Sequence, residues 1–155
     1  MMEILGAFPN LENDKHFKIT SKRDQSYNCI AWAAIKDDII WWPHDKPIDG
    51  TDWPFGLERI NTLEVFTNLF GNMGYEICES SDYEVGFQKI AIYHNPDTKK
   101  CTHASRLRSD GFWTSKLGPE QDIIHGDPSS VEGEYYGIVA RLMKRKNPEF
   151  KKSKK

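Results

Sequence analysis

The clearest hydrophobic pattern in the chain lies between residues 61 and 74. Apolar side chains recur there at the spacing of one helix face, at Leu63, Phe66, Phe70 and Met73. Asn61 and Glu64 have the spacing of a capping box, and Gly74 suits the position just after a helix. The pattern predicts a helix whose apolar stripe is structural.

A second, shorter apolar run follows the polar residues 23–28. Residues 30–34 favour or tolerate a helix, and either Ser26 or Asn28 can cap it. The run therefore predicts a helix that has Cys29 in its first turn, continues through Ala34 and can extend toward residues 39–40. Pro43 ends this segment, because the residue before a proline is biased away from helix.

Short strands are expected after residue 74. They cover residues 75–78 with Ile77 inward, 89–93, 101–107, 112–117 and 135–143, with an Asp-Gly hairpin turn at 110–111 and a break at Gly118-Pro119. Residues 7–24 lack periodicity and predict an entry loop with at most a short strand around residues 17–19. Helices followed by strands indicate an α+β class, with N-terminal helices packed on an antiparallel meander sheet.

The proline- and glycine-rich stretch 43–58 also holds two large aromatic residues, Trp53 and Phe55. An ordered loop of this length either packs over the core or borders a ligand cleft. Packing over the core is the commoner use of such aromatics.

Length and charge describe one domain with a basic end. The 155 residues are typical of a single domain, here residues 1–143. The formal charge is −2, but residues 144–155 hold seven basic residues and one acid, so they carry +6 and the body carries −8. We expect the segment 144–155 to be a disordered, solubilising tail. An acidic body makes nucleic acid an unlikely partner.

Cysteine and histidine spacing excludes several classes of protein. Three cysteines without close spacing argue against a disulfide framework, and the five histidines show no metal-ligand spacing, so we expect no cofactor and no metal. No apolar run reaches the roughly 18 residues of a membrane span, and residues 1–6 do not form a signal peptide. We expect a cytoplasmic protein, or one exported without a cleavable signal, and no membrane partner.

Cys29 is the candidate nucleophile. In the first turn of a helix, free backbone N–H groups and the helix dipole lower a thiol pKa, and the thiolate is the reactive form. A buried, inert cysteine is the alternative, because free cysteine is among the most buried residue types.

His103 is the candidate base. Strand alternation places Cys101, His103 and Ser105 on one face, where an imidazole can take the Cys29 proton and form a thiolate–imidazolium pair. A third group should orient the imidazole. Ser115 fits this role from the next strand, and Asp122 and His125 are other polar candidates; Asp122 can equally be a polar residue of a turn or a first helical turn.

The order of these parts resembles the papain-like cysteine hydrolases, most closely the NlpC/P60-like branch. Residues 27–31, Tyr-Asn-Cys-Ile-Ala, resemble its aromatic-Asp-Cys-small-Gly segment, and residues 102–104, Thr-His-Ala, resemble its histidine segment. Asn28 stands where the branch has Asp, Ala31 where it has Gly, and Ser115 where it usually has His, Asn or Gln. Residues 41–43 and 113–118 resemble a narrower bacterial group of domains without an assigned activity.

The resemblance implies a papain-like fold and a thiol hydrolase that cleaves a peptide, isopeptide or related amide bond. Cys29 would be the nucleophile, His103 the base, and Ser115 or Asp122 the third group. The Cys29 backbone N–H and either Gln25 or the Tyr27 hydroxyl would bind the oxyanion, with Trp42 and Trp113 as candidate substrate-binding aromatics. The alternatives are a non-catalytic binding module and an immunity-type interaction protein on the same scaffold, with a protein partner instead of a substrate.

Overall fold

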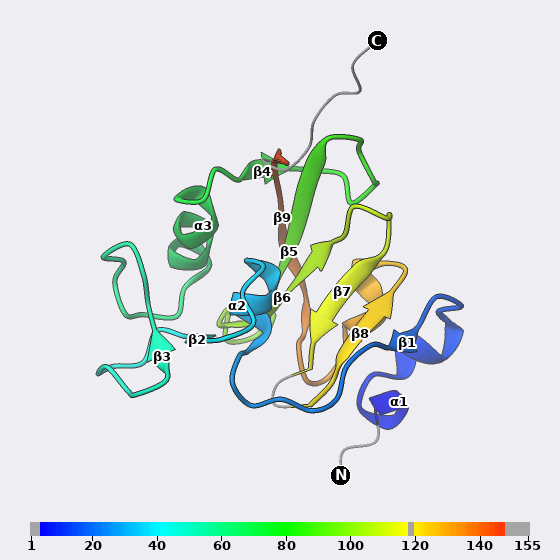
Figure 1. Cartoon of the computed structure of the whole chain (residues 1–155), viewed down its shortest axis with the longest axis horizontal. Helices are drawn as coiled ribbons and strands as arrows, with labels where there is room; N and C mark the ends of the chain where they lie inside the picture. The colour runs from blue at the N-terminus through cyan, green and yellow to red at the C-terminus, as the bar shows by residue number, and fades with distance from the viewer. Residues whose placement is uncertain (1–3, 118–119, 148–155) are drawn as a thin grey trace.

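A seven-stranded antiparallel sheet dominates the protein (Figure 1). The computed structural model describes residues 4–117 and 120–147. The strands follow the spatial order β1 (Lys18–Ile19), β8 (Asp122–His125), β7 (Trp113–Lys116), β6 (Cys101–Leu107), β5 (Phe87–His94), β9 (Ile138–Lys146) and β4 (Glu76–Cys78). Two residues each of β2 (Ile40–Trp41) and β3 (Thr51–Asp52) form a small parallel pair.

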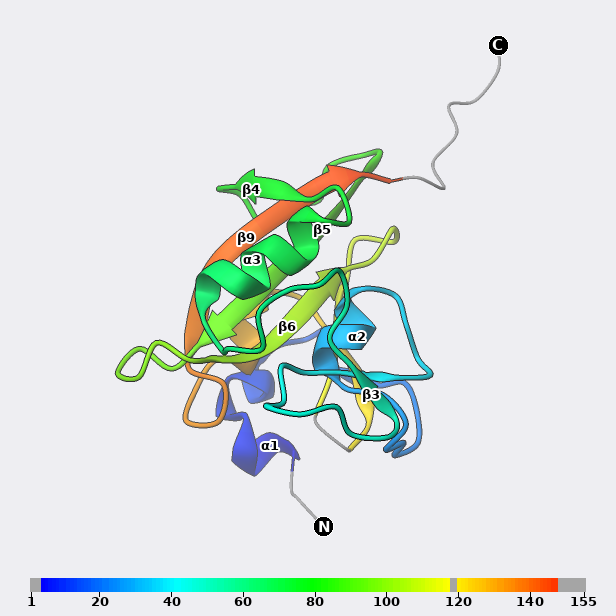
Figure 2. The ribbon, with the colours of Figure 1, turned by 90° about the vertical axis from the view of Figure 1, so that its left-hand side faces the viewer.

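Within the described ranges, helices are few and short. They are α1 (Ile4–Ala7), α2 (Cys29–Ala33), α3 (Leu63–Gly71) and the 3₁₀ turns η1 (Pro9–Asn13) and η2 (Pro128–Val131). Figure 2 shows α2 and α3 on the viewer's side of β5, β6 and β9.

The predicted fold class, N-terminal helices packed on a meander sheet in a papain-like fold, is wrong. The structure is a β-rich fold with few helices, because α2 has only five residues and the sheet adds β8 to the predicted strands. The helix predicted from Cys29 ends at Ala33, and Lys36 N–H already bonds back to Ala31 O in a closing turn. Ile35 follows this helix with a positive φ of 66°, which interrupts any helical continuation toward Ile40.

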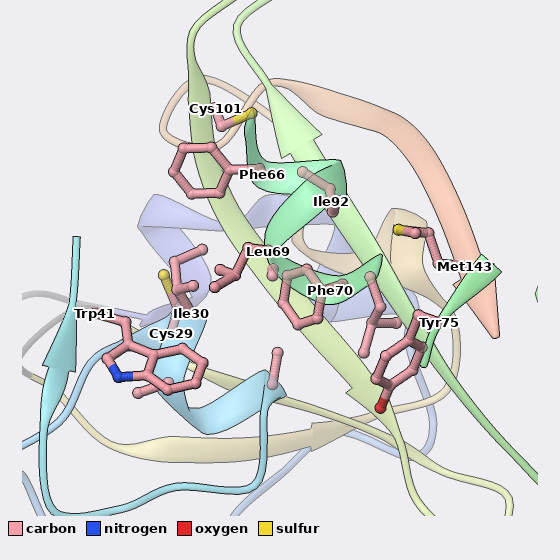
Figure 3. Close-up of a cluster of buried hydrophobic side chains, with 14 of the residues drawn as sticks. Cys29, Ile30, Trp41, Phe66, Leu69, Phe70, Tyr75, Ile92, Cys101 and Met143 are labelled. Atoms are coloured by element: carbon pink, nitrogen blue, oxygen red, sulfur yellow. The ribbon is translucent and has the colours of Figure 1, made fainter. Parts of the chain in front are cut away.

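Two apolar clusters hold the two sides of the sheet. On β5, Ile90 and Ile92 belong to the cluster shared with α2 and α3, whereas Ala91 and Tyr93 belong to the cluster beneath α1 and η1. This split follows from strand alternation. Figure 3 shows the first cluster, in which Phe66 of α3 is fully buried. Burying one such aromatic side chain contributes roughly 1.5–3 kcal/mol to folding.

The predicted helix between residues 61 and 74 is present as α3, but its cap differs. Thr62, and not Asn61, is the N-cap, and its hydroxyl accepts the Val65 N–H at 3.1 Å. Asn61 instead holds the backbone of Cys101, whose N–H donates to Asn61 Oδ1 at 2.7 Å and whose C=O accepts from Nδ2 at 2.9 Å. A long-range contact has therefore replaced the predicted capping box.

A bulge at the start of β6 changes which residues share a face. Tyr93 pairs with His103 but His94 pairs with Cys101, so Thr102 is an extra residue on β6. Cys101 consequently lies in the α2 and α3 cluster, while His103 contacts Tyr93 on the other side. The prediction that Cys101 and His103 share a face is wrong.

Other boundaries moved as well. Ile77 is 58% exposed on the edge strand β4, not inward. Strand β9 begins at Ile138 and continues through Lys146, so three residues of the predicted tail belong to the sheet. The predicted break at Gly118-Pro119 and tail residues 148–155 lie outside the described residues. Trp53, in the loop at 43–58, is buried against Phe66, while Phe55 is half exposed.

Candidate active site

Asn28 fixes the start of α2 and with it the position of Cys29. Its Oδ1 accepts N–H groups from Ala31 at 3.2 Å and from Trp41 at 3.1 Å. Its Nδ2 donates to the Trp41 carbonyl at 2.8 Å. One side chain thus caps the helix and ties it to β2, so the Cys29 backbone has a single defined position.

The Cys29 thiol is protonated and enclosed. Burial raises its pKa to about 11, against the opposing effect of the Ala104, Ile30 and Cys29 backbone N–H groups that face the sulfur. Only 6% of the residue is exposed. The helix-start donors expected from the sequence are present, but desolvation outweighs them, so the resting site holds a thiol and not a thiolate.

His103 is a fully buried imidazole with one free nitrogen. Its Nε2 lies 2.9 Å from Ser115 Oγ, and its ring stacks on Tyr136 with centroids 3.9 Å apart and planes 5° apart. Its Nδ1 is buried and has no hydrogen-bond partner among the described residues. Burial and the neighbouring His125 hold the pKa of His103 well below its usual value, so the ring is neutral at pH 7.

Ser115 connects His103 to a second buried histidine. Its Oγ lies 2.8 Å from His125 Nε2, and His125 Nδ1 lies 2.9 Å from the Asp127 carbonyl oxygen. Burial lowers the pKa of His125 to about 4. The three side chains come from β6, β7 and β8, which are adjacent in the sheet, and form one continuous relay.

Cys29 and His103 lie beside the same peptide bond but do not hydrogen-bond in the described structure. The Ala104 N–H that faces the thiol belongs to the peptide that joins Ala104 to His103. Tyr136 lies near both groups. Its ring stacks on His103, and its pKa is raised mainly by burial and, to a smaller extent, by electrostatic interaction with Cys29. Cys29 thus belongs to the cluster on the α2 and α3 side and His103 contacts Tyr93 on the other side, so the candidate nucleophile and base share a neighbouring peptide bond and are both neutral.

Asp122 belongs to a separate polar group. It begins β8, is 3% exposed, and its Oδ2 accepts the Tyr27 hydroxyl at 2.7 Å. Lys116 Nζ lies 4.7 Å from the Tyr27 ring and donates to the Asp24 carbonyl at 2.6 Å. Asp122 hydrogen-bonds to Tyr27 while His103 hydrogen-bonds to Ser115, and the Tyr27 hydroxyl that donates to Asp122 is not free for an oxyanion.

The remaining sequence candidates lie apart from this relay. Gln25 is exposed, Trp42 packs edge-on against Phe66, and Trp113 is 2% exposed in the second apolar cluster. Both tryptophans have structural positions.

Sequence reasoning did not place two residues of the site on their observed elements. His125 was one of several polar candidates, because the strand that carries it went unrecognised. Tyr136 was placed inside the last strand, yet it precedes β9 in the turn closed by Gly133 and Gly137. The β-branched pair Ile123-Ile124, followed by the turn residues at 126–128, is a local signal for β8, but it is too short to define a strand by itself.

Within residues 4–117 and 120–147, no group of histidine, cysteine and acidic side chains is arranged to hold a metal ion. The same part of the chain contains no helix long and apolar enough to cross a membrane.

Comparison with known proteins identifies one family. The family described as "Domain of unknown function (DUF7689)" matches residues 18–144, which include Cys29, His103, Ser115 and His125. No curated protein and no solved structure matches the chain. Since the match spans most of the sequence, the chain belongs to the DUF7689 family.

Proposed function

We propose that this protein is a thiol-dependent hydrolase of a peptide, isopeptide or related amide bond, with Cys29 as nucleophile and His103 as base. The observation that carries the proposal is the buried Nδ1 of His103, which has no partner among the described residues and lies on the residue next to the amide that faces Cys29. Leaving such a group unsatisfied costs about 1–3 kcal/mol, a cost that a catalytic role explains.

The two neutral groups define the order of events. His103 Nδ1 accepts the thiol proton as Cys29 Sγ attacks the substrate carbonyl carbon, so the S–C bond forms as the proton leaves. The backbone N–H of Cys29, at the start of the helix, stabilises the oxyanion in this proposal. His103 then returns the proton to the leaving amine as the C–N bond breaks. Water, deprotonated by His103, hydrolyses the thioester and restores the thiol.

Further support comes from the residues themselves. Residues 27–31 and 102–104 resemble the nucleophile and histidine segments of NlpC/P60-like enzymes. The cysteines Cys29, Cys78 and Cys101 are all free, which is typical of the cytoplasm, and we propose that the activity resides there.

The second candidate function is a non-catalytic binding or immunity-type interaction protein. The burial of Cys29, at 6% exposed with a pKa raised to about 11, favours it. In that case the acidic body would contact a basic partner, and binding would not depend on the thiol.

The test is labelling of the native protein at pH 7 with iodoacetamide, with each cysteine read separately by mass spectrometry. The hydrolase proposal expects Cys29 to react at least tenfold faster than Cys101, and to lose that advantage in His103→Gln. A peptide-amide library assayed for released amine with the same two proteins gives the bond cleaved. The proposal would be overturned if Cys29 were labelled at the same rate in the wild type and in His103→Gln and neither protein released amine from the library.

A further inference from the structure

The relay from His103 to Asp127 has a fixed end. The Asp127 carbonyl oxygen can only accept a hydrogen bond, so His125 Nδ1, 2.9 Å away, carries the proton. His125 is neutral, because burial holds its pKa near 4. Its Nε2 therefore has a lone pair and no proton.

The direction of the remaining hydrogen bonds follows from that end. Ser115 must donate its single O–H to His125 Nε2 at 2.8 Å. The Ser115 oxygen is then an acceptor for His103, so the proton between them, across 2.9 Å, belongs to His103 Nε2. A neutral imidazole carries one N–H, which leaves His103 Nδ1 bare.

We infer that His125 is a positioning residue that, through Ser115, holds His103 in the Nε2–H tautomer and keeps its Nδ1 available as a base. The inference about the tautomer stands on the geometry of the hydrogen bonds and on a neutral His125, and its meaning for catalysis rests on the proposed function. The free Nδ1 of His103 is what this direction of the relay requires.

Loss of the hydrogen-bond acceptor at position 125 should change the tautomer of His103. Without an acceptor at position 125, the Ser115 hydroxyl is free to donate to His103 Nε2 instead. His103 would then carry its proton on Nδ1, where it cannot accept the thiol proton. Protonation of His125 would have the same effect. The charged groups facing His125 are Asp14, which follows η1, and Asp127, with His103 on the β6 side.

The test is long-range ¹H–¹⁵N correlation NMR on the full chain with ¹⁵N-labelled histidine at pH 7. In the wild type His103 should be the Nε2–H tautomer with an unprotonated Nδ1. In His125→Leu the Nδ1–H form should become the major one. His125→Gln, whose amide can donate to the Asp127 carbonyl and accept from Ser115, should restore the wild-type tautomer. The signals of His94, which lies outside the relay, should not move.

The catalytic reading is measured separately on the same proteins. His125→Leu should lower kcat by ten- to a hundredfold with little change in KM, and His125→Gln should recover most of it. If the wild type turns over no substrate, the hydrolase proposal fails while the tautomer result still decides the relay. His103 remaining Nε2–H in His125→Leu would overturn the inference. Should His125→Leu not fold, Ser115→Ala provides the same measurement, with a mixture of tautomers expected and a pure Nε2–H form contradicting the relay.

Discussion

Cys29 and Cys101 lie in the same buried apolar cluster, yet their surroundings differ in kind (Figure 3). Burial raises the thiol pKa of both, to about 11 for Cys29 and about 12 for Cys101. Each region is also held by one asparagine, since Asn28 caps α2 and holds Trp41 while Asn61 holds the Cys101 backbone. Burial and anchoring therefore do not distinguish the two cysteines.

The difference lies in what faces each sulfur. Three backbone N–H groups lower the pKa of Cys29, whereas the charge of Arg141 is the opposing influence on Cys101. Both cysteines lie in the cluster on the α2 and α3 side, whereas His103 contacts Tyr93 on the other side. Cys29 nevertheless faces the Ala104 N–H, which belongs to the peptide that follows His103, and His103 Nδ1 has no partner among the described residues. The comparison teaches that a buried thiol becomes a candidate nucleophile through its donors and its base and not through its degree of exposure.

The largest expected effect is on catalysis. Cys29→Ala should reduce amide turnover by at least about 10³-fold, or about 4 kcal/mol of transition-state stabilisation, because no other group can form the thioester. Cys101→Ala, the matched change in the same cluster, should keep turnover within about threefold. Turnover is measured on the best substrate of the peptide-amide library. Equal losses in the two variants would show that packing, and not nucleophilicity, connects Cys29 to activity.

Local features of the Cys29 region could be predicted from the sequence. A helix with Cys29 in its first turn, capped by either Ser26 or Asn28, depends on neighbouring residues; the structure confirms the helix start and has Asn28 as the cap. Strand β6 was also predicted with its observed bounds, because residues 101–107 lie between two turn signals. That Ser115 lies beside His103 was expected from the Asp-Gly turn that joins their strands.

Long-range features could not be predicted. The bulge puts Cys101 and His103 on opposite faces of β6. It arises from pairing with β5, and no residue of β6 predicts it. Strand β8 is four residues long and is defined by its ladder to β7, so the partner of Ser115, His125, could not be assigned. The spacing of Asn61 and Glu64 suggested a helix cap. The actual partner of Asn61, Cys101, is 40 residues away in the chain, so local spacing could not reveal it.

Acid destabilisation should be next in size. The pKa of folded His125, about 4, is below the 6.5 of an exposed histidine, and that of His103 is also lowered by burial. The unfolded chain thus binds more protons, so this stabilisation is complete above pH 6.5 and is lost as the pH falls toward 4. For His125 the loss amounts to at most about 3 kcal/mol.

Urea unfolding at several pH values between 6.5 and 4 measures this loss. His125→Gln should flatten the dependence of the unfolding free energy on pH, since one of the two buried imidazoles is gone. Arg141→Met changes the Cys101 region without removing a histidine and should keep the wild-type slope. A slope that is unchanged in His125→Gln would mean that His125 does not titrate differently on unfolding.

The smallest expected effect separates the two asparagines. Asn28→Ala should destabilise the fold by about 2 kcal/mol, since it removes a helix cap and both bonds to Trp41. Asn61→Ala removes two bonds to the Cys101 backbone and should cost about 1–2 kcal/mol. Urea unfolding at pH 7 measures both.

Only Asn28→Ala should also slow iodoacetamide labelling of Cys29, because only Asn28 fixes the backbone donors that face this sulfur. If Asn61→Ala slowed Cys29 labelling equally, the reactivity of Cys29 would depend on packing of the whole cluster. The backbone N–H groups that face Cys29 would then not explain the difference between the two cysteines.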